Sequence, residues 1–133
     1  MNEKYVYEQV VLKCDERTVT GRVYPRDIVE KALKEFQGPV KERKVFGPIG
    51  PADTTMHLRD AAFVVAKVEL EGKEVKATIE TLSGLEAGVQ LERNLKLGHV
   101  ELTPVAMGSV SEGGRVGSDL KFIGFSVRPK AGA

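Results

Sequence analysis

Hydroxyl and imidazole side chains are the residues of this chain that could carry out nucleophilic chemistry. His57 precedes Thr103 by 46 residues, and Ser109 follows on a glycine-rich stretch. A serine or threonine hydroxyl is a poor nucleophile at neutral pH until a base such as histidine accepts its proton. An enzyme that uses His57 with Thr103 or Ser109 is therefore one hypothesis for this sequence.

Strand alternation argues against His57 as that base. It shares strand parity with Arg59, Lys67 and Glu69, so its imidazole is expected to face solvent. The second histidine, His99, comes just after a predicted helix, where a cation interacts favourably with the helix dipole. Two separated histidines without clustered carboxylates predict no metal site, and no motif indicates a cofactor.

The glycine-rich loop at residues 111–118, with Ser109 and Gly108 just before it, is expected to form turns. It lacks both the Gly-x-Ser-x-Gly order of an exposed nucleophile and the Gly-Lys-Ser/Thr ending of a phosphate-binding loop. Glycines in such a segment normally allow the backbone to turn tightly.

Length and charge limit the classes of function. The chain has 133 residues, 20 Lys and Arg against 19 Asp and Glu, and one cysteine, Cys14. We expect one domain over residues 1–128 with a flexible tail at 129–133. Near-neutral charge favours protein partners over nucleic acid or a membrane surface. The single cysteine excludes an internal disulfide and suits a reducing cytosol, and no secretory signal or apolar span is apparent.

The hydrophobic pattern predicts an α+β fold. Alternating apolar residues indicate strands, 3.6-residue spacing indicates helices, and Gly and Pro mark the connections. The expected order is a strand at 5–12, a helix at 25–36 stopped by Gly38-Pro39, an irregular loop at 46–53, a strand at 56–70 turning at Gly72 into another at 75–82, a helix at 85–97 capped by Gly98, and strands at 100–110 and 120–127. The long hairpin and the last strand should supply the core, with Val64, Val68, Ile79 and Phe122 buried.

Short motifs in this framework resemble the prohead maturation proteases of tailed bacteriophages. Thr20-Gly21-Arg22-Val23-Tyr24-Pro25 is similar to their Asn-Gly-Arg-x-Tyr-Pro signature. Met107-Gly108-Ser109-Val110 resembles the Gly-Ser-Val that follows their nucleophilic serine, and Gly124-Phe125-Ser126-Val127 resembles their Gly-Phe-Asp-Val ending. The resemblance implies a compact antiparallel β-barrel with about two flanking helices, a fold shared with herpesvirus assemblins.

The positions that carry the chemistry in that family are altered here. Thr103 and Pro104 occupy the place of its Ser-Ser pair, Gly50 occupies the place of the histidine in Gly-Glu-Leu-x-His-Pro, and Phe63 occupies the place of a second histidine. Nucleophile and base are thus replaced together, which implies a degenerate and inactive member of the family. An active small prohead protease using His57, Thr103 or Ser109 is the alternative.

Loss of catalysis with retention of the fold implies a structural role in the virion. We expect an auxiliary or decoration protein that is assembled in the host cytoplasm and binds the major capsid protein or another virion protein, without cofactor, nucleic acid or membrane. An internal core component, a host-directed binding module and a homo-oligomer are alternatives. The capsid contacts are expected on two loops, with Phe46, Pro48, Ile49 and Pro51 in the first and Ser111, Glu112, Arg115 and Val116 in the second.

Overall fold

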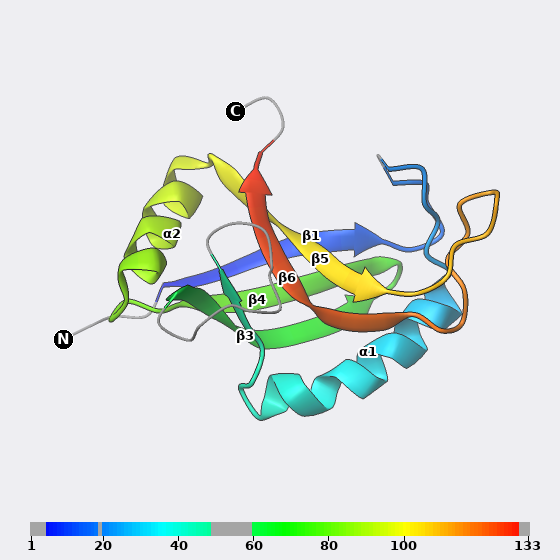
Figure 1. Ribbon diagram of the computed structural model, residues 1–133, viewed down its shortest axis with the longest axis horizontal. Helices are drawn as coiled ribbons and strands as arrows, with labels where there is room; N and C mark the ends of the chain where they lie inside the picture. The colour runs from blue at the N-terminus through cyan, green and yellow to red at the C-terminus, as the bar shows by residue number, and fades with distance from the viewer. Residues whose placement is uncertain (1–4, 19, 49–59, 131–133) are drawn as a thin grey trace.

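A computed structural model describes residues 5–18, 20–48 and 60–130 of the chain (Figure 1). These residues form an α+β fold, as expected, in which the strands pair antiparallel. In chain order the elements are β1 (Val6–Lys13), α1 (Arg26–Lys41), β2 (Phe46–Pro48), β3 (Ala61–Glu71), β4 (Glu74–Thr81), α2 (Glu86–Leu97), β5 (Val100–Met107) and β6 (Lys121–Pro129).

The strands lie in two sheets, and the prediction of a closed barrel is wrong. One sheet has the strand order β1-β4-β3-β2, and the other consists of β5 and β6. No backbone ladder among the described residues joins the two sheets. Pro48 in β2 and Pro104 in β5 have no N–H to donate, and proline in a sheet belongs to edge strands. The barrel therefore stays open where β1 faces β5 and where β2 faces β6.

Two glycines with positive φ confirm the predicted hairpin and the end of the second helix. Gly72, with φ +60°, turns β3 into β4, and Gly98, with φ +73°, is the left-handed cap of α2. The backbone N–H groups of Gly98 and His99 donate to the carbonyls of Leu95 and Asn94 at 3.1 Å each. This motif satisfies carbonyls that the last helical turn would otherwise leave unpaired.

Helix α1 runs to Lys41, past the Gly38-Pro39 pair that was predicted to stop it at residue 36. The side chain of Val40 is buried one turn after Phe36, so the additional turn extends the apolar face of the helix. Gly38 has no Cβ to clash with the ring of Pro39, which reduces the usual penalty for a helical residue before proline. Burial of Val40 therefore outweighs the one hydrogen bond lost at Pro39.

The prediction of an irregular loop is also wrong at its first three residues, which form β2. Phe46 pairs with Val64 and Gly47 with Phe63. A Cβ on Gly47 would overlap the ring of Phe63, so glycine lets the two strands approach with that ring between them. Residues 49–53 of the predicted loop lie outside the described residues.

The core lies between the two sheets and under the two helices. Helix α1 packs on β3 and β6, and α2 packs on β3, β4 and β5 (Figure 1). The four residues predicted to be buried are confirmed, namely Val64, Val68, Ile79 and Phe122. No helix of the described chain is both long enough and apolar enough to cross a membrane.

Candidate functional site

Thr103 and Pro104 lie in the middle of β5, opposite Ser126 and Phe125 of β6. Both are half-buried, and they line a hollow of about 220 Å³. Residues of the segment that resembles the protease signature form the facing wall, among them Thr20, Arg22 and Tyr24. The fold thus brings Thr20, Arg22 and Tyr24 close to Thr103 and Pro104. The residues that line this hollow include threonines and a tyrosine, whose hydroxyls are its nucleophilic groups, and no histidine.

Ser109 is bound to a carboxylate. Its hydroxyl donates to Oδ1 of Asp119 at 2.8 Å, and its backbone N–H donates to both carboxylate oxygens at 3.0 Å. These backbone and side-chain hydrogen bonds lower the pKa of Asp119. A carboxylate with a lowered pKa is a weak base at neutral pH. The arrangement closes the loop between residues 109 and 119, and it does not activate the Ser109 hydroxyl.

The sequence-predicted catalytic residues do not converge among the described residues. Thr103 and Ser109 are six residues apart along β5 and its continuation, a separation of roughly 20 Å in an extended strand. His99 lies before the start of β5, at the opposite end of that strand from Ser109. His57, the predicted base, lies outside the described residues.

Phe63, which the motif resemblance aligns with a histidine of the family, is part of the core. Phe63 is fully buried, and its ring contacts Gly47 of the neighbouring strand β2. The Phe63 side chain does not reach solvent.

The described part of the first predicted docking loop, residues 46–48, is the strand β2. Phe46 and Pro48 are half-buried at the open edge of the four-stranded sheet. Ile49 and Pro51 lie outside the described residues. Phe46 lines an apolar groove of about 400 Å³ with Met107 and Ile123, whose side chains are 64% and 48% exposed.

The second predicted docking loop is an ordered turn. Ser111, Glu112 and Arg115 are exposed, and the backbone of Ser111 pairs with that of Arg115. Val116 is only 3% exposed and belongs to the core, so its prediction as a capsid contact is wrong. The bridge between Val116 and Val110 turns the Val116 side chain inward. The loop lies well apart from β2 in Figure 1, so the two predicted loops form separate surfaces.

An arginine that sequence reasoning missed ties this turn to the signature segment. Nη1 of Arg17 donates to the carbonyls of Gly21 at 2.7 Å and Gly113 at 3.1 Å. Gly114 fits against the carbonyl of Gly21, where a Cβ would overlap it. The partners are 96 residues apart in the chain, and no local pattern in the sequence signals the contact.

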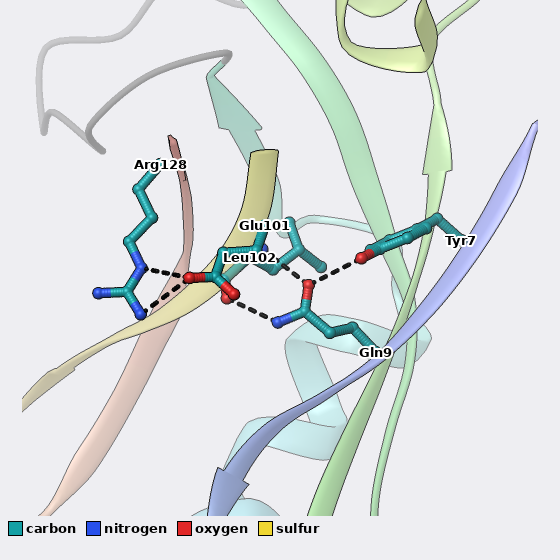
Figure 2. A network of polar contacts seen from close by, with 5 residues as sticks. All are labelled: Tyr7, Gln9, Glu101, Leu102 and Arg128. Carbon is teal, nitrogen blue, oxygen red and sulfur yellow. Dashed lines mark hydrogen bonds and ion pairs between the residues drawn. The ribbon is translucent and has the colours of Figure 1, made fainter. Parts of the chain in front are cut away.

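A second missed contact joins the two sheets through side chains (Figure 2). Nε2 of Gln9 donates to the carbonyl of Leu102, and Oε1 of Gln9 accepts from the Leu102 N–H. The Tyr7 hydroxyl donates to the same Oε1 at 3.0 Å, while Glu101 binds Arg128 on the outer side of β5. Burial, and then the nearby Tyr5 and Glu101, raise the pKa of Tyr7, so its hydroxyl stays protonated.

The part of the chain that the structure describes contains no candidate metal site and no reactive thiol. No group of three or more His, Cys, Asp or Glu side chains is gathered there. Cys14 is buried, and burial, with a smaller effect of Asp15, raises the pKa of its thiol. A thiol that stays protonated is a poor nucleophile.

Comparison with known proteins gives one informative likeness. No family model matches the sequence, and no curated protein matches it. Among solved structures, the fold is similar to the capsid assembly protease gp21 of bacteriophage T4, with a TM-score of 0.80 and 22% sequence identity over 93% of this chain and 80% of that chain. The fold expected from the sequence motifs is thus confirmed as that of a phage capsid protease, although its sheets do not close into a barrel.

Proposed function

We propose that this protein is a catalytically inactive relative of phage capsid assembly proteases that acts as an auxiliary protein on the capsid lattice. The observation that supports the proposal is the likeness of the fold to a capsid assembly protease. The motif resemblance aligns Thr103, Pro104 and Phe63 with the family's serines and a histidine. A serine-type protease needs a nucleophile and its base together. The proposed location is the virion.

The step from fold to role follows from what such a protease must already do. A protease that acts in capsid assembly must bind the protein segments that it cleaves. Loss of the nucleophile removes cleavage and leaves the binding surfaces in place. Because one fold hosts many functions, the role depends on surfaces and must be tested there.

The apolar groove beside β2 supports a docking role. Met107 and Ile123 are large and exposed, and Phe46 lines the same groove with Phe36 and Pro39 of α1. Lys44 and Lys121 also line it. An exposed apolar patch with a charged rim is typical of protein interaction sites. A second contact surface is proposed on the exposed turn with Ser111, Glu112 and Arg115.

Co-sedimentation with assembled capsid shells tests the proposal. Wild-type protein is expected to pellet with procapsids or mature shells at a fixed ratio to the major capsid protein. The double variant Met107→Asp/Ile123→Asp should lose this binding, because aspartate cannot be buried in an apolar interface without an ionic partner. The matched control Val89→Asp/Leu97→Asp changes two exposed apolar residues of α2 and should bind as the wild type does.

Absence of wild-type binding to both kinds of shell would reject the capsid role. Unchanged binding by the folded groove variant, and by a second variant with the 111–118 turn shortened, would reject these surfaces as the contacts. An active protease is the competing function, and it is favoured by the activity of the similar T4 protein. The peptidase assay in the Discussion separates the two.

A further inference from the structure

A groove runs along the second half of β1, beyond the Gln9 contact with β5. Two adjoining hollows of about 390 and 220 Å³ form it, and they share the wall residues Val11, Leu12, Thr18 and Arg128. The groove is therefore continuous from the end of β1 to the signature segment and β5.

One wall of this groove is a free strand edge. β1 pairs with β4 along one edge, and Gln9 alone ties its other edge to β5. Beyond Gln9, the backbone of residues 10–13 forms no hydrogen bond with any described residue outside the β1–β4 ladder. An unpaired edge of this kind can accept an extended chain as an additional strand.

The groove is also strongly cationic. Its lining includes four exposed cations, Lys13, Arg17, Arg22 and Arg128, and one carboxylate, Glu16. Within the described chain, Lys13 and Arg22 form no ion pair, and the Arg17 guanidinium is bound by neutral carbonyls. Arg128 is already paired with Glu101 at 3.1 Å. The whole protein has a formal charge of only +1, so positive charge is concentrated here.

We propose that this groove binds an extended acidic segment of another protein, which adds to the free edge of β1 and places its carboxylates against Lys13, Arg17 and Arg22. Backbone pairing supplies affinity, and the charges select the partner. Val10, which is 36% exposed, and half-buried Val11 offer apolar contacts to alternate side chains of the segment. A nucleic acid is disfavoured, because Tyr24 is the single aromatic among the lining residues and stacking on aromatic side chains is the usual means of binding single strands. The proposal does not depend on the capsid role.

Fluorescence anisotropy with labelled peptides tests the groove directly. The probe is a peptide of about eight residues, the length of a long strand, in which Glu and Val alternate. Two matched peptides serve as controls: one carries Lys in place of Glu, and the other keeps Glu but has N-methyl groups on alternate backbone nitrogens. Only the first probe is expected to bind, and its affinity should fall as salt is raised.

Charge reversal locates the binding. Lys13→Glu/Arg22→Glu should lower the affinity for the acidic peptide at least about tenfold, since like charges would then face each other. Lys31→Glu/Lys34→Glu changes the net charge equally on exposed residues of α1 and should leave binding unchanged. If the reversal variant fails to fold, Lys13→Gln/Arg22→Gln tests the same contacts with a smaller expected loss.

Four results would overturn the proposal. Equal binding of the N-methylated peptide would exclude strand addition, and equal weakening by the α1 control would reduce the effect to net charge. Failure of the acidic peptide to bind, or tighter binding of a single-stranded DNA oligonucleotide of similar charge, would exclude an acidic protein segment as the occupant.

Discussion

The side-chain amide of Gln9 pairs with the backbone of Leu102 as a neighbouring strand would. Nε2 donates to the Leu102 carbonyl at 2.9 Å, and Oε1 accepts from the Leu102 N–H at 2.9 Å (Figure 2). A side chain thereby supplies the hydrogen bonds that a closed barrel would obtain from its backbone. The two residues are 93 positions apart.

Replacing Gln9 by Ala should therefore lower the free energy of unfolding by about 1–3 kcal/mol, because both backbone groups of Leu102 lose their partner in a partly buried place. Urea denaturation measures the change. Tyr7→Phe is the control: it removes one hydrogen bond and keeps the Gln9–Leu102 pair, so about 0.5–1.5 kcal/mol is expected. A Gln9→Ala protein as stable as the wild type would show that the pair contributes nothing.

Phe122→Ala should cost about 3–5 kcal/mol, as expected for loss of an enclosed aromatic ring. The Phe122 side chain is 5% exposed, and its ring centroid lies 6.1 Å from that of Phe36 in α1. Ile123 is the next residue of β6, and its side chain is 48% exposed. Ile123→Ala should therefore change the free energy of unfolding by less than about 0.5 kcal/mol. Equal effects of the two substitutions would be inconsistent with the placement of β6 on the core.

Gly47→Ala should destabilise the protein by about 1–3 kcal/mol or more, since its methyl group would overlap the ring of Phe63. Phe63→Leu removes the ring that this methyl group would overlap, and it lowers the free energy of unfolding by itself. In the double variant the two losses should be clearly less than additive, which thermal or urea denaturation of all four proteins can establish. Strict additivity would mean that β2 does not lie against Phe63.

The Ser109–Asp119 contact predicts an acid-dependent contribution to stability. The pKa of Asp119 is lower in the folded protein, so the unfolded chain binds more protons between the two pKa values, and stability rises with pH there. The contribution is complete above the ordinary aspartate range and is lost as the pH falls through the folded pKa. Stability curves of the wild type and of Asp119→Asn should therefore differ at neutral pH and converge in acid. Curves that stay parallel down to about pH 3 would rule out this contribution.

Purified protein should not cleave capsid-protein substrates, and serine-directed electrophiles should not label it. The reason is that, in the proposed alignment, Thr103 and Pro104 take the place of the serine pair, and that Ser109 is bound by Asp119. Mass spectrometry of the substrate and of the protein detects both reactions. His57→Ala, Thr103→Ala and Ser109→Ala are the controls, and cleavage by the wild type that any of them abolishes would establish the active-protease alternative.

Local pattern was sufficient for the elements whose signals are local. Gly72 and Gly98 carry positive φ where a hairpin turn and a helix cap were predicted, and the alternation around Val68 and Ile79 placed the correct side chains in the core. Helix α1 exceeded its prediction because burial of Val40, a tertiary effect, outweighs the stop signal at Gly38-Pro39.

Closure of the sheets was the main error in the fold. The prolines at 48 and 104 carry the signal for edge strands, and they could have argued against a barrel. The cationic groove had no comparable signal, because Lys13, Arg17, Arg22 and Arg128 come together only when the β5–β6 pair packs against the four-stranded sheet. Val116 was misplaced because a short turn can face inward as easily as outward until its bridge to Val110 is known.

The open seam between β1 and β5 has a consequence for how the molecule fluctuates. Since β5 and β6 share no backbone ladder with the four-stranded sheet, they can separate from it by breaking side-chain contacts and apolar packing while all their mutual hydrogen bonds persist. Amide hydrogen exchange should therefore group β5 with β6 and β1 with β3 and β4, as two cooperative units of unequal protection. Gln9→Ala should accelerate the opening of the β5–β6 unit selectively, with the Leu102 amide responding first.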